Sequence, residues 1–191
     1  MEKHSEIIDF KEKNLTIPIG IVKQINTIKY VDKEYIENQL KDIKNNRDRI
    51  FIKFLWTTGI RITEAISIKK KDILFDQNII IIKWLKKRKE LSRTIPLHKS
   101  LKEILILYTA KMNLNDKLFD FTRQRAFHIT KKNLGISPHV FRHSFAVHYL
   151  KQGGRLNDLK KLLGHSNINI TIIYSELTQT ELTEEVNKID F

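Results

Sequence analysis

The sequence predicts a mainly α-helical domain with a small antiparallel β-sheet, that is, an α+β fold. Most of its 191 residues lie in stretches whose apolar residues recur three or four positions apart, as on one face of a helix. Residues 79–84 are instead a run of β-branched and aromatic residues, which is typical of a strand. No linker divides the chain. We therefore expect one domain over 28–191, preceded by an extension of uncertain structure over 1–27.

Composition and charge limit the class of protein. The chain has 35 basic and 22 acidic residues, a net charge of +13, and 41% hydrophobic residues. This is enough apolar material for a core, and the charge favours a polyanionic partner, nucleic acid before an anionic membrane, although a generally basic proteome would give the same charge. The absence of cysteine excludes disulfides and thiol nucleophiles. No membrane span or signal peptide is evident, which predicts a cytoplasmic protein.

Three helices are predicted in the first part of the chain. The first begins after its capping residue Asp32 and ends at Asn45–Asn46. The second is buried and ends at Gly59, and the third runs from its capping residue Thr63 to Ile68. The apolar residues that define the first two helices are Ile36, Leu40, Ile43, Ile50, Phe51, Phe54 and Leu55.

A β-hairpin and two helices are predicted in the middle of the chain. Strand Ile79–Trp84 is expected to pair with strand Arg93–Leu97, and the segment between them, LKKRKELS at 85–92, is a basic hairpin loop. Apolar residues at helical spacing follow over Ser100–Ala110. A basic amphipathic helix is then predicted over Thr122–Asn133.

The last third of the chain is predicted to be helical. One helix runs from Pro138 to Gly153–Gly154, and a second, capped by Asn157, covers Leu159–Leu163 and ends at Gly164. The aromatic residues on the buried face of the first are Phe141, Phe145 and Tyr149. Two further helices are expected, over 168–174 and over about 178–191. The last has a capping box of Thr178 and Glu181 and an apolar stripe of Leu182, Val186 and Ile189.

Residues 137–146, SPHVFRHSFA, carry the first chemical signal. Pro138 suits the first position of a helix, which places His139 and Arg142 on one face near its opening turn. Helix N-termini attract anions, so an arginine and an imidazole there form a candidate phosphate site. The alternative is a core helix with an ordinary arginine.

Three other stretches have the same character. Arg61 follows a helix stop in TTGIRITEA, and basic residues crowd the hairpin at 86–89. His165 follows a glycine stop in LLGHSNINITIIY, and Tyr174 comes nine residues later. Taken singly, these residues also fit a solvated loop, a nonspecific DNA contact and a core tyrosine. Together they supply phosphodiester transfer without a metal or cofactor: arginines for the oxygens, histidines, a lysine acid and a hydroxyl nucleophile.

Three blocks of the chain resemble the tyrosine recombinase, or phage integrase, family. They are TTGIRITEAISIKKKDI, SPHVFRHSFAVHYL and LKKLLGHSNINITIIY, and their order and spacing match over about residues 28–174. The resemblance implies the fold of that family's catalytic domain. It also implies site-specific cutting and rejoining of double-stranded DNA.

The resemblance assigns roles residue by residue. Arg61 and Arg142 would hold the scissile phosphate, with His139 and His165 assisting. Tyr174 would attack phosphorus, leaving a 3′-phosphotyrosyl bond and a free 5′-hydroxyl. The family's catalytic lysine lies on the hairpin, and the first choice here is Lys86, with Lys87 second. Glu64 matches an acidic family position that orients its neighbours, although an ordinary first-turn glutamate is an equal interpretation.

The resemblance also implies partners. Family members act as tetramers around two DNA duplexes through a Holliday junction, some with an accessory protein, and their C-terminal helices dock onto neighbouring subunits. The apolar stripe over 178–191 would suit such docking or would pack on its own core. Residues 1–27 are too short for the family's usual N-terminal helical domain.

Three rival interpretations stay open at this point. A type IB topoisomerase shares the tyrosine chemistry, and a DNA-binding remnant would keep the fold without catalysis. A zinc site is disfavoured because His139 and His143 lack the glutamate of zinc hydrolases and flank Arg142. His143 and His148 are interpreted as structural or DNA-facing. The histidines without evident partners are His4, His98 and His128.

Overall fold

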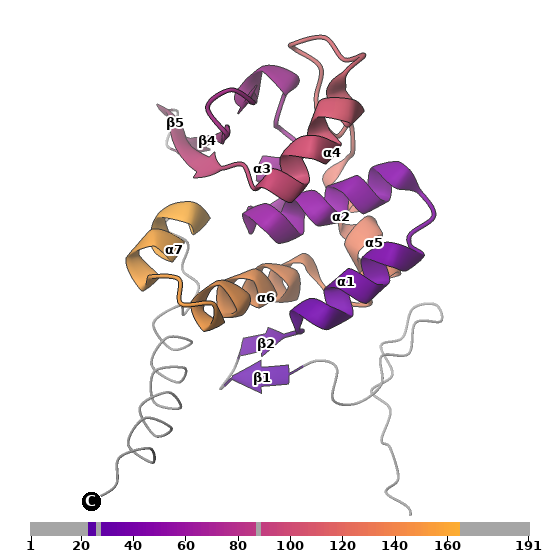
Figure 1. Ribbon diagram of the computed structural model, residues 1–191, viewed down its shortest axis with the longest axis vertical. Helices are drawn as coiled ribbons and strands as arrows, with labels where there is room; N and C mark the ends of the chain where they lie inside the picture. Colours follow the sequence, from indigo (N-terminus) through magenta and orange to yellow (C-terminus); the bar gives the residue numbers. More distant parts are fainter. Residues whose placement is uncertain (1–22, 26–27, 87–88, 165–191) are drawn as a thin grey trace, which may run out of the picture.

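The computed structural model describes residues 23–25, 28–86 and 89–164, which form a helical body with two small antiparallel sheets (Figure 1). The described elements, in order, are β1 (Lys23–Ile25), β2 (Ile28–Tyr30), α1 (Lys33–Asp42), α2 (Asn46–Thr58), α3 (Ile62–Ala65), the 3-10 helix η1 (Lys70–Asp72), β3 (Ile73–Leu74), β4 (Ile79–Lys86), β5 (Lys89–Pro96), α4 (Lys99–Thr109), α5 (Arg123–Leu134), α6 (Pro138–Lys151) and α7 (Leu156–Leu163). This confirms the predicted α+β class.

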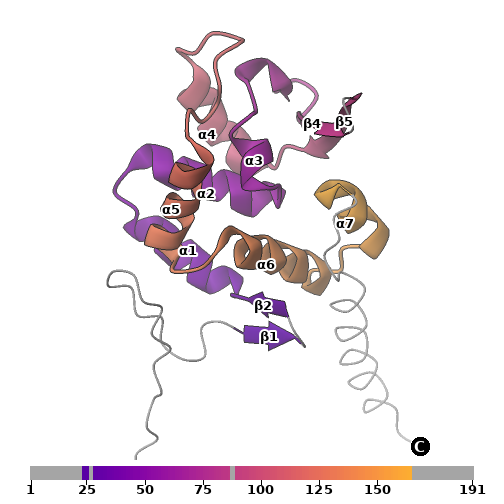
Figure 2. The ribbon, with the colours of Figure 1, turned by 180° about the vertical axis from the view of Figure 1, so that it is seen from behind.

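Helix α2 is the centre of the main core. Its side chains are buried on most sides, as expected for a helix that is apolar almost all round. Phe51 and Phe54 meet Phe119 edge to face, with ring centroids 5.0 and 5.4 Å apart. In both ribbon views α4 lies on one side of α2 and α6 on the other (Figures 1 and 2). The core therefore holds the end of α2 in a fixed place.

A smaller apolar cluster joins α6, α7 and β2. Its buried residues are Tyr30, Ala146, Val147, Leu150, Leu159 and Leu163. Phe145 and Tyr149 stack beside it with centroids 6.1 Å apart. Each ring lies against a glycine, since a Cβ on Gly59 or Gly154 would come within 2.2 or 2.1 Å of a ring atom. Gly59 also has a φ of 62°, so this close crossing of α2 and α6 requires glycine there.

The predicted hairpin loop is shorter than expected. Strands β4 and β5 stay paired from Ile79↔Pro96 to Lys86↔Lys89, so only residues 87–88 lie between them. The prediction of a loop over 85–92 was wrong. Lysine has a weak preference for strands, but the backbone hydrogen bonds between the two strands and a connection of only two residues favour extending both strands. Strand β3 completes a three-stranded sheet in the order β3-β4-β5.

Two capping predictions were wrong. Helix α3 begins at Ile62, so Thr63 lies inside it, and the Glu64 carboxylate accepts a hydrogen bond from the Arg61 backbone N–H instead. Helix α7 begins at Leu156, because the Arg155 carbonyl already accepts from Leu159 N, and Asn157 is therefore within the helix. Sequence patterns locate a helix more securely than its first residue.

The predicted glycine stops are confirmed, because Gly59 and Gly164 end α2 and α7 in the left-handed region. The start of α5 at Arg123 is also close to the prediction, and the Thr122 side chain caps this helix. The Asn45 side chain caps α2, which was not predicted, and α3 ends at Ala65, before the predicted Ile68. Strand β1, which pairs with β2, lies in the stretch left without a predicted element. The helices predicted over 168–174 and 178–191 lie outside the described residues. None of the described helices is long and apolar enough to cross a membrane.

Candidate active site

Arg61 is placed by the end of α2. Gly59 reverses the chain with its left-handed backbone, and Arg61 becomes the residue before the first turn of α3. Its side chain is 44% exposed, so the guanidinium reaches solvent. A cation held at a rigid helix junction and open to water is suited to meet an anion.

Helix α6 supplies His139 and Arg142 as predicted. The Ser137 side chain caps the helix by accepting from Val140 N at 3.4 Å, and Pro138 is in its first turn. His139 is exposed, whereas Arg142 is buried. Helix spacing therefore puts the two side chains on the same opening turn but at different depths.

Arg142 joins two separate segments of the backbone. Its Nη1 donates to the Gly59 carbonyl at 2.7 Å and its Nη2 donates to the Leu163 carbonyl at 2.6 Å. These bonds use two of the five N–H donors of a guanidinium. The side chain is thus fixed between the end of α2 and the end of α7 and keeps donors for an anion.

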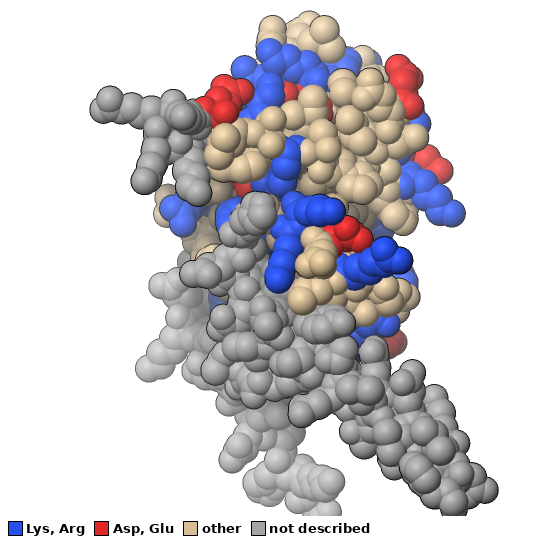
Figure 3. All heavy atoms as spheres, turned by 90° about the vertical axis from the view of Figure 1, so that its left-hand side faces the viewer, with Lys and Arg blue, Asp and Glu red and all other residues tan. Residues whose placement is uncertain are grey.

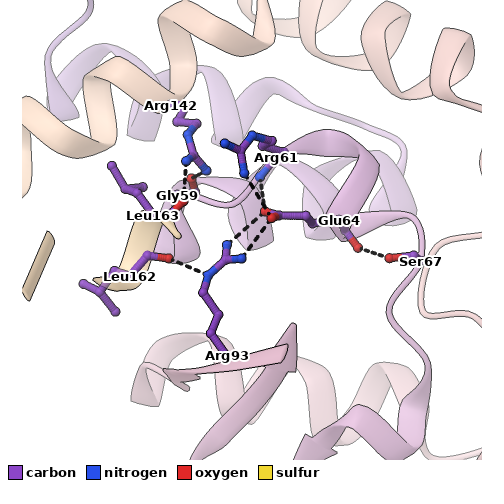
Figure 4. A network of polar contacts seen from close by, with 8 residues as sticks. All are labelled: Gly59, Arg61, Glu64, Ser67, Arg93, Arg142, Leu162 and Leu163. Atoms are coloured by element: carbon purple, nitrogen blue, oxygen red, sulfur yellow. Dashed lines mark hydrogen bonds and ion pairs between the residues drawn. The ribbon is translucent and has the colours of Figure 1, made fainter. Parts of the chain in front are cut away.

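Glu64 organises the cluster, which Figure 4 shows from close by. Its Oε2 accepts from Arg61 N at 2.9 Å, and its Oε1 is 3.2 Å from Arg61 Nη1. Arg93 Nη1 and Nη2 donate to the two oxygens at 2.9 and 3.0 Å. Burial acts to raise the pKa of Glu64, but the bonds from Arg93 and Arg61 and the nearby positive charges outweigh it and lower the pKa. The carboxylate therefore stays ionised.

The cluster carries an excess of positive charge. Three guanidinium groups, those of Arg61, Arg93 and Arg142, surround the single carboxylate of Glu64 (Figure 4). The pKa of Arg142 is lowered to about 9, chiefly by burial and also by the nearby charges of Arg61 and Arg93, while Glu64 acts in the opposite direction. Arg142 thus remains a cation at neutral pH, in surroundings that an added negative charge would stabilise.

The structure brings some of the predicted site residues together and leaves others undescribed. Arg61 and Arg142 lie in the same cluster, where each affects the charge of the other, and His139 is one turn from Arg142. Lys86 is the last residue of β4, but its side chain is not among those described. Two further candidates, His165 and Tyr174, and the second-choice lysine Lys87 lie outside the described residues. In the sequence, His165 directly follows Gly164, the residue that ends α7.

Arg93 was predicted only as a strand residue, yet it belongs to this cluster. Its side chain is 11% exposed, and its Nε donates to the Leu162 carbonyl at 3.0 Å. A signal was present in the sequence, because residues of a strand alternate between faces and Arg93 shares its face with the buried Ile95. A charged residue on the buried face of a strand requires a partner, and here that partner is Glu64.

The remaining histidines have structural surroundings. Burial, together with His139 and Arg142, lowers the pKa of His143, and the backbone of Lys29 opposes the shift. His148 lies against Trp56 with ring centroids 5.4 Å apart. His98, predicted to lack a partner, caps α4 by accepting from Ser100 N at 3.2 Å. Within the described part of the chain, no three metal-ligating side chains gather into a potential metal site.

One face of the molecule is rich in basic side chains. Figure 3 views the side that lies on the left of Figure 1, where α7 and the β4–β5 hairpin are found, and Lys and Arg side chains gather across its middle. Such a face attracts polyanions.

Comparison with known proteins gives the family. Residues 29–181 match the model of the phage integrase family, and the chain belongs to that family. The chain is 34% identical over 176 residues to the tyrosine recombinase XerA of Saccharolobus solfataricus, covering 90% of this chain and 60% of that protein. It is 29% identical to XerA of Pyrococcus horikoshii, covering 94% of this chain and 69% of that protein.

Solved structures give the same fold. A crystal structure of XerA recombinase superposes with a TM-score of 0.62 at 22% identity, covering 85% of this chain and 66% of that one. The catalytic domain of bacteriophage HP1 integrase gives a TM-score of 0.60 at 23% identity, with 83% and 94% covered. The described fold is therefore that of a tyrosine recombinase catalytic domain, as predicted.

Proposed function

We propose that this chain is a site-specific DNA recombinase that cuts and rejoins double-stranded DNA through a 3′-phosphotyrosyl intermediate. The observation that carries the proposal is that Arg61, Arg93 and Arg142 gather around the single buried carboxylate of Glu64, with positive charge in excess. Membership of the phage integrase family supports it. So does the structure of a related recombinase, XerH, bound to its difH substrate, which matches with a TM-score of 0.56 at 24% identity, covering 80% of this chain and 52% of that one.

In the proposed reaction Tyr174 is the nucleophile. Its phenolic oxygen gives its proton to one of the two proposed histidines and forms a bond to phosphorus, while the bond from phosphorus to the 5′ oxygen breaks. Arg61 and Arg142 hold the non-bridging oxygens, on which negative charge grows in the transition state. His139 and His165 donate hydrogen bonds to the same group.

The leaving 5′ oxygen requires a proton. We assign its donor to the β4–β5 hairpin, with Lys86 the first choice and Lys87 the second. Lys86 ends β4, and Lys87 follows it in the sequence between the two paired strands, so both belong to the hairpin segment. A lysine there donates its proton as the P–O bond breaks and leaves a free 5′-hydroxyl.

The intermediate explains how strands are exchanged. The phosphotyrosyl bond conserves the energy of the broken phosphodiester, so a 5′-hydroxyl from another strand reseals it without ATP. Exchange between two duplexes requires several active sites. We therefore propose a homotetramer on DNA that passes through a Holliday junction, with or without an accessory protein.

A covalent-adduct assay tests the proposal. The purified protein is incubated, without divalent metal, with nicked duplexes tiled from the DNA that flanks its gene, and the products are resolved on a denaturing gel. We expect an adduct with the wild type and with the control Tyr149→Phe, a half-buried α6 tyrosine, but none with Tyr174→Phe.

The other outcomes separate the rival functions. An adduct that persists in Tyr174→Phe would mean that another residue is the nucleophile. DNA binding without an adduct would favour a non-catalytic DNA-binding protein. Relaxation of supercoiled DNA without strand exchange would favour a type IB topoisomerase.

A further inference from the structure

Arg93 connects the two halves of the cluster through bonds in opposite directions. It lies in β5, and its partners Glu64 and Leu162 are 29 and 69 residues away in the sequence. Two N–H groups of its guanidinium meet the Glu64 carboxylate side by side, and its Nε donates to the Leu162 carbonyl at 3.0 Å. One planar group thus fixes the distance between α3 and the end of α7.

The Arg93 guanidinium also lies close to Trp84 and Gly164. Its Cζ lies 5.3 Å from the centre of the Trp84 ring. On the α7 side, a Cβ added to Gly164 would be 2.7 Å from Nη1, so the guanidinium rests directly on that glycine. Gly164 immediately precedes His165. The position of Arg93 is therefore linked to the start of the segment that carries the proposed nucleophile.

Glu64 transmits the position of Arg93 to Arg61. Each of its oxygens accepts one bond from Arg93 and one from Arg61, so the two arginines share both oxygens. Arg61 binds Oε2 through its backbone N–H, but it binds Oε1 only through the guanidinium of a side chain that is 44% exposed. The paired bond from Arg93 fixes the plane of the carboxylate.

Arg93 and Arg142 bind adjacent carbonyls. Arg93 donates a hydrogen bond to the Leu162 carbonyl and Arg142 donates one to the Leu163 carbonyl, and these are the last two residues of α7 (Figure 4). If Arg93 is removed, Arg142 is the one of these two arginines that still binds this end of the helix, and Glu64, which binds Arg61, loses its paired bond. A change at Arg93 would thus affect the positions of both proposed phosphate-binding arginines, Arg61 and Arg142.

We propose that Arg93 is a positioning residue, which sets Arg61 and the end of α7 in register with each other without contacting the phosphate itself. The inference rests on the proposed recombinase function. Its alternative is a purely structural ion pair, in which Arg93 serves only to neutralise the buried Glu64. The two roles predict different results for Arg93→Lys. Lysine keeps the charge that a structural ion pair needs, but its single ammonium cannot bind Glu64 and Leu162 at the same time, as positioning requires.

The test compares Arg93→Lys, Arg93→Met and the double variant Arg93→Met with Glu64→Gln, which removes both charges. Three quantities are measured for each: the melting temperature, the Kd for a nicked duplex, and the single-turnover rate of adduct formation at saturating DNA. We expect Arg93→Lys and the double variant to melt close to wild type and to bind DNA within about threefold, because few charges change on the exposed surface. We expect their adduct rates to fall roughly 10- to 100-fold through misplaced groups.

A second substrate separates positioning from proton donation. A bridging sulfur in place of the 5′ oxygen leaves as a thiolate, whose conjugate acid has a pKa of about 8.5, so no acid is needed. We expect this substrate to restore the adduct rate of whichever of Lys86→Ala and Lys87→Ala is slow on the ordinary duplex. Arg93→Lys should remain slow on it, because its defect lies at the phosphate and the nucleophile.

The outcomes distinguish the two proposals. No adduct from the wild type would overturn the recombinase function and the role of Arg93 with it. A wild-type adduct with an Arg93→Lys rate near wild type would overturn the role of Arg93 alone. So would a rate that recovers on the sulfur substrate, since Arg93 would then act on the leaving group.

Discussion

Arg142 is the residue at which burial and charge are most closely combined. We expect Arg142→Lys to slow adduct formation at saturating DNA by roughly 10²- to 10³-fold, because lysine cannot bind two carbonyls and a phosphate together. The control is Arg49→Lys, an exposed arginine in the first turn of α2, about 15 Å along the helix from Gly59. Equal slowing in both variants, in single-turnover assays, would contradict the assignment.

Glu64 makes the site sensitive to acid. A carboxylate whose pKa is lowered in the folded state contributes stability above its unfolded value, 4.5, and loses that contribution as the pH falls through the folded pKa. We expect the free energy of unfolding of the wild type to exceed that of Glu64→Gln most at neutral pH. The difference should shrink below pH 4.5. Urea unfolding at several pH values measures it, and a difference that stays constant with pH would count against an ionised Glu64.

Residue-level prediction from sequence succeeded where the signal is local. His139 and Arg142 are three positions apart on one helix, and Arg61 directly follows a helix stop, so short-range rules placed them. The partnership of Arg93 with Glu64 and Leu162 depends on how β5, α3 and α7 meet, and the periodicity of a single strand does not contain that information. The sequence indicated that Arg93 lies on the buried face of its strand, but it did not indicate which residues Arg93 would bind.

At the scale of elements, the crossing of α2 and α6 depends on Gly59. Alanine there has to adopt a φ of 62° and also displace the Phe145 ring, 2.2 Å from the added Cβ. Gly153→Ala is a matched control, since its φ is 79° and nothing lies within 4 Å. We expect a cost of about 1–2 kcal/mol for Gly153→Ala and about 1–3 kcal/mol more for Gly59→Ala.

Chemical denaturation measures both glycine variants. Equal losses of stability would mean that the Phe145 ring moves aside freely and that the crossing is not tight. A larger loss for Gly59→Ala would support a tight crossing, which fixes the carbonyl that Arg142 binds.

Elements were predicted better than their ends. The long helices followed from apolar spacing, because their buried faces repeat every three or four residues. The start of α3 was misjudged because the Glu64 carboxylate binds the backbone N–H of Arg61, and the start of α7 because the Arg155 carbonyl accepts a helical hydrogen bond. The hairpin loop was misjudged because the strands pair across most of it. These competing bonds involve groups that carry little residue-specific signal.

At the scale of the whole molecule, the net charge of +13 sets how DNA binding responds to salt. If the basic face contacts roughly 6–10 phosphates, the affinity for DNA should fall about 10³- to 10⁵-fold between roughly 50 and 200 mM salt. Fluorescence anisotropy with a labelled duplex over a salt series measures the slope. An affinity that hardly changes with salt would contradict binding through this face.

The fold as a whole was predicted correctly as α+β, and the family followed from three blocks of residues. Strand β1 was missed because three residues carry too little periodicity, and its pairing with β2 is a tertiary contact. The charged face was predicted only as a net charge, since composition does not say where on the surface the charges lie.

Identifying the residue attached to DNA is the most direct test of the central claim. The adduct is trapped on a nicked duplex, digested with protease and nuclease, and examined by peptide mass spectrometry. We predict a nucleotide joined through its 3′-phosphate to Tyr174. Attachment at another residue, or through a 5′-phosphate, would contradict the proposed mechanism.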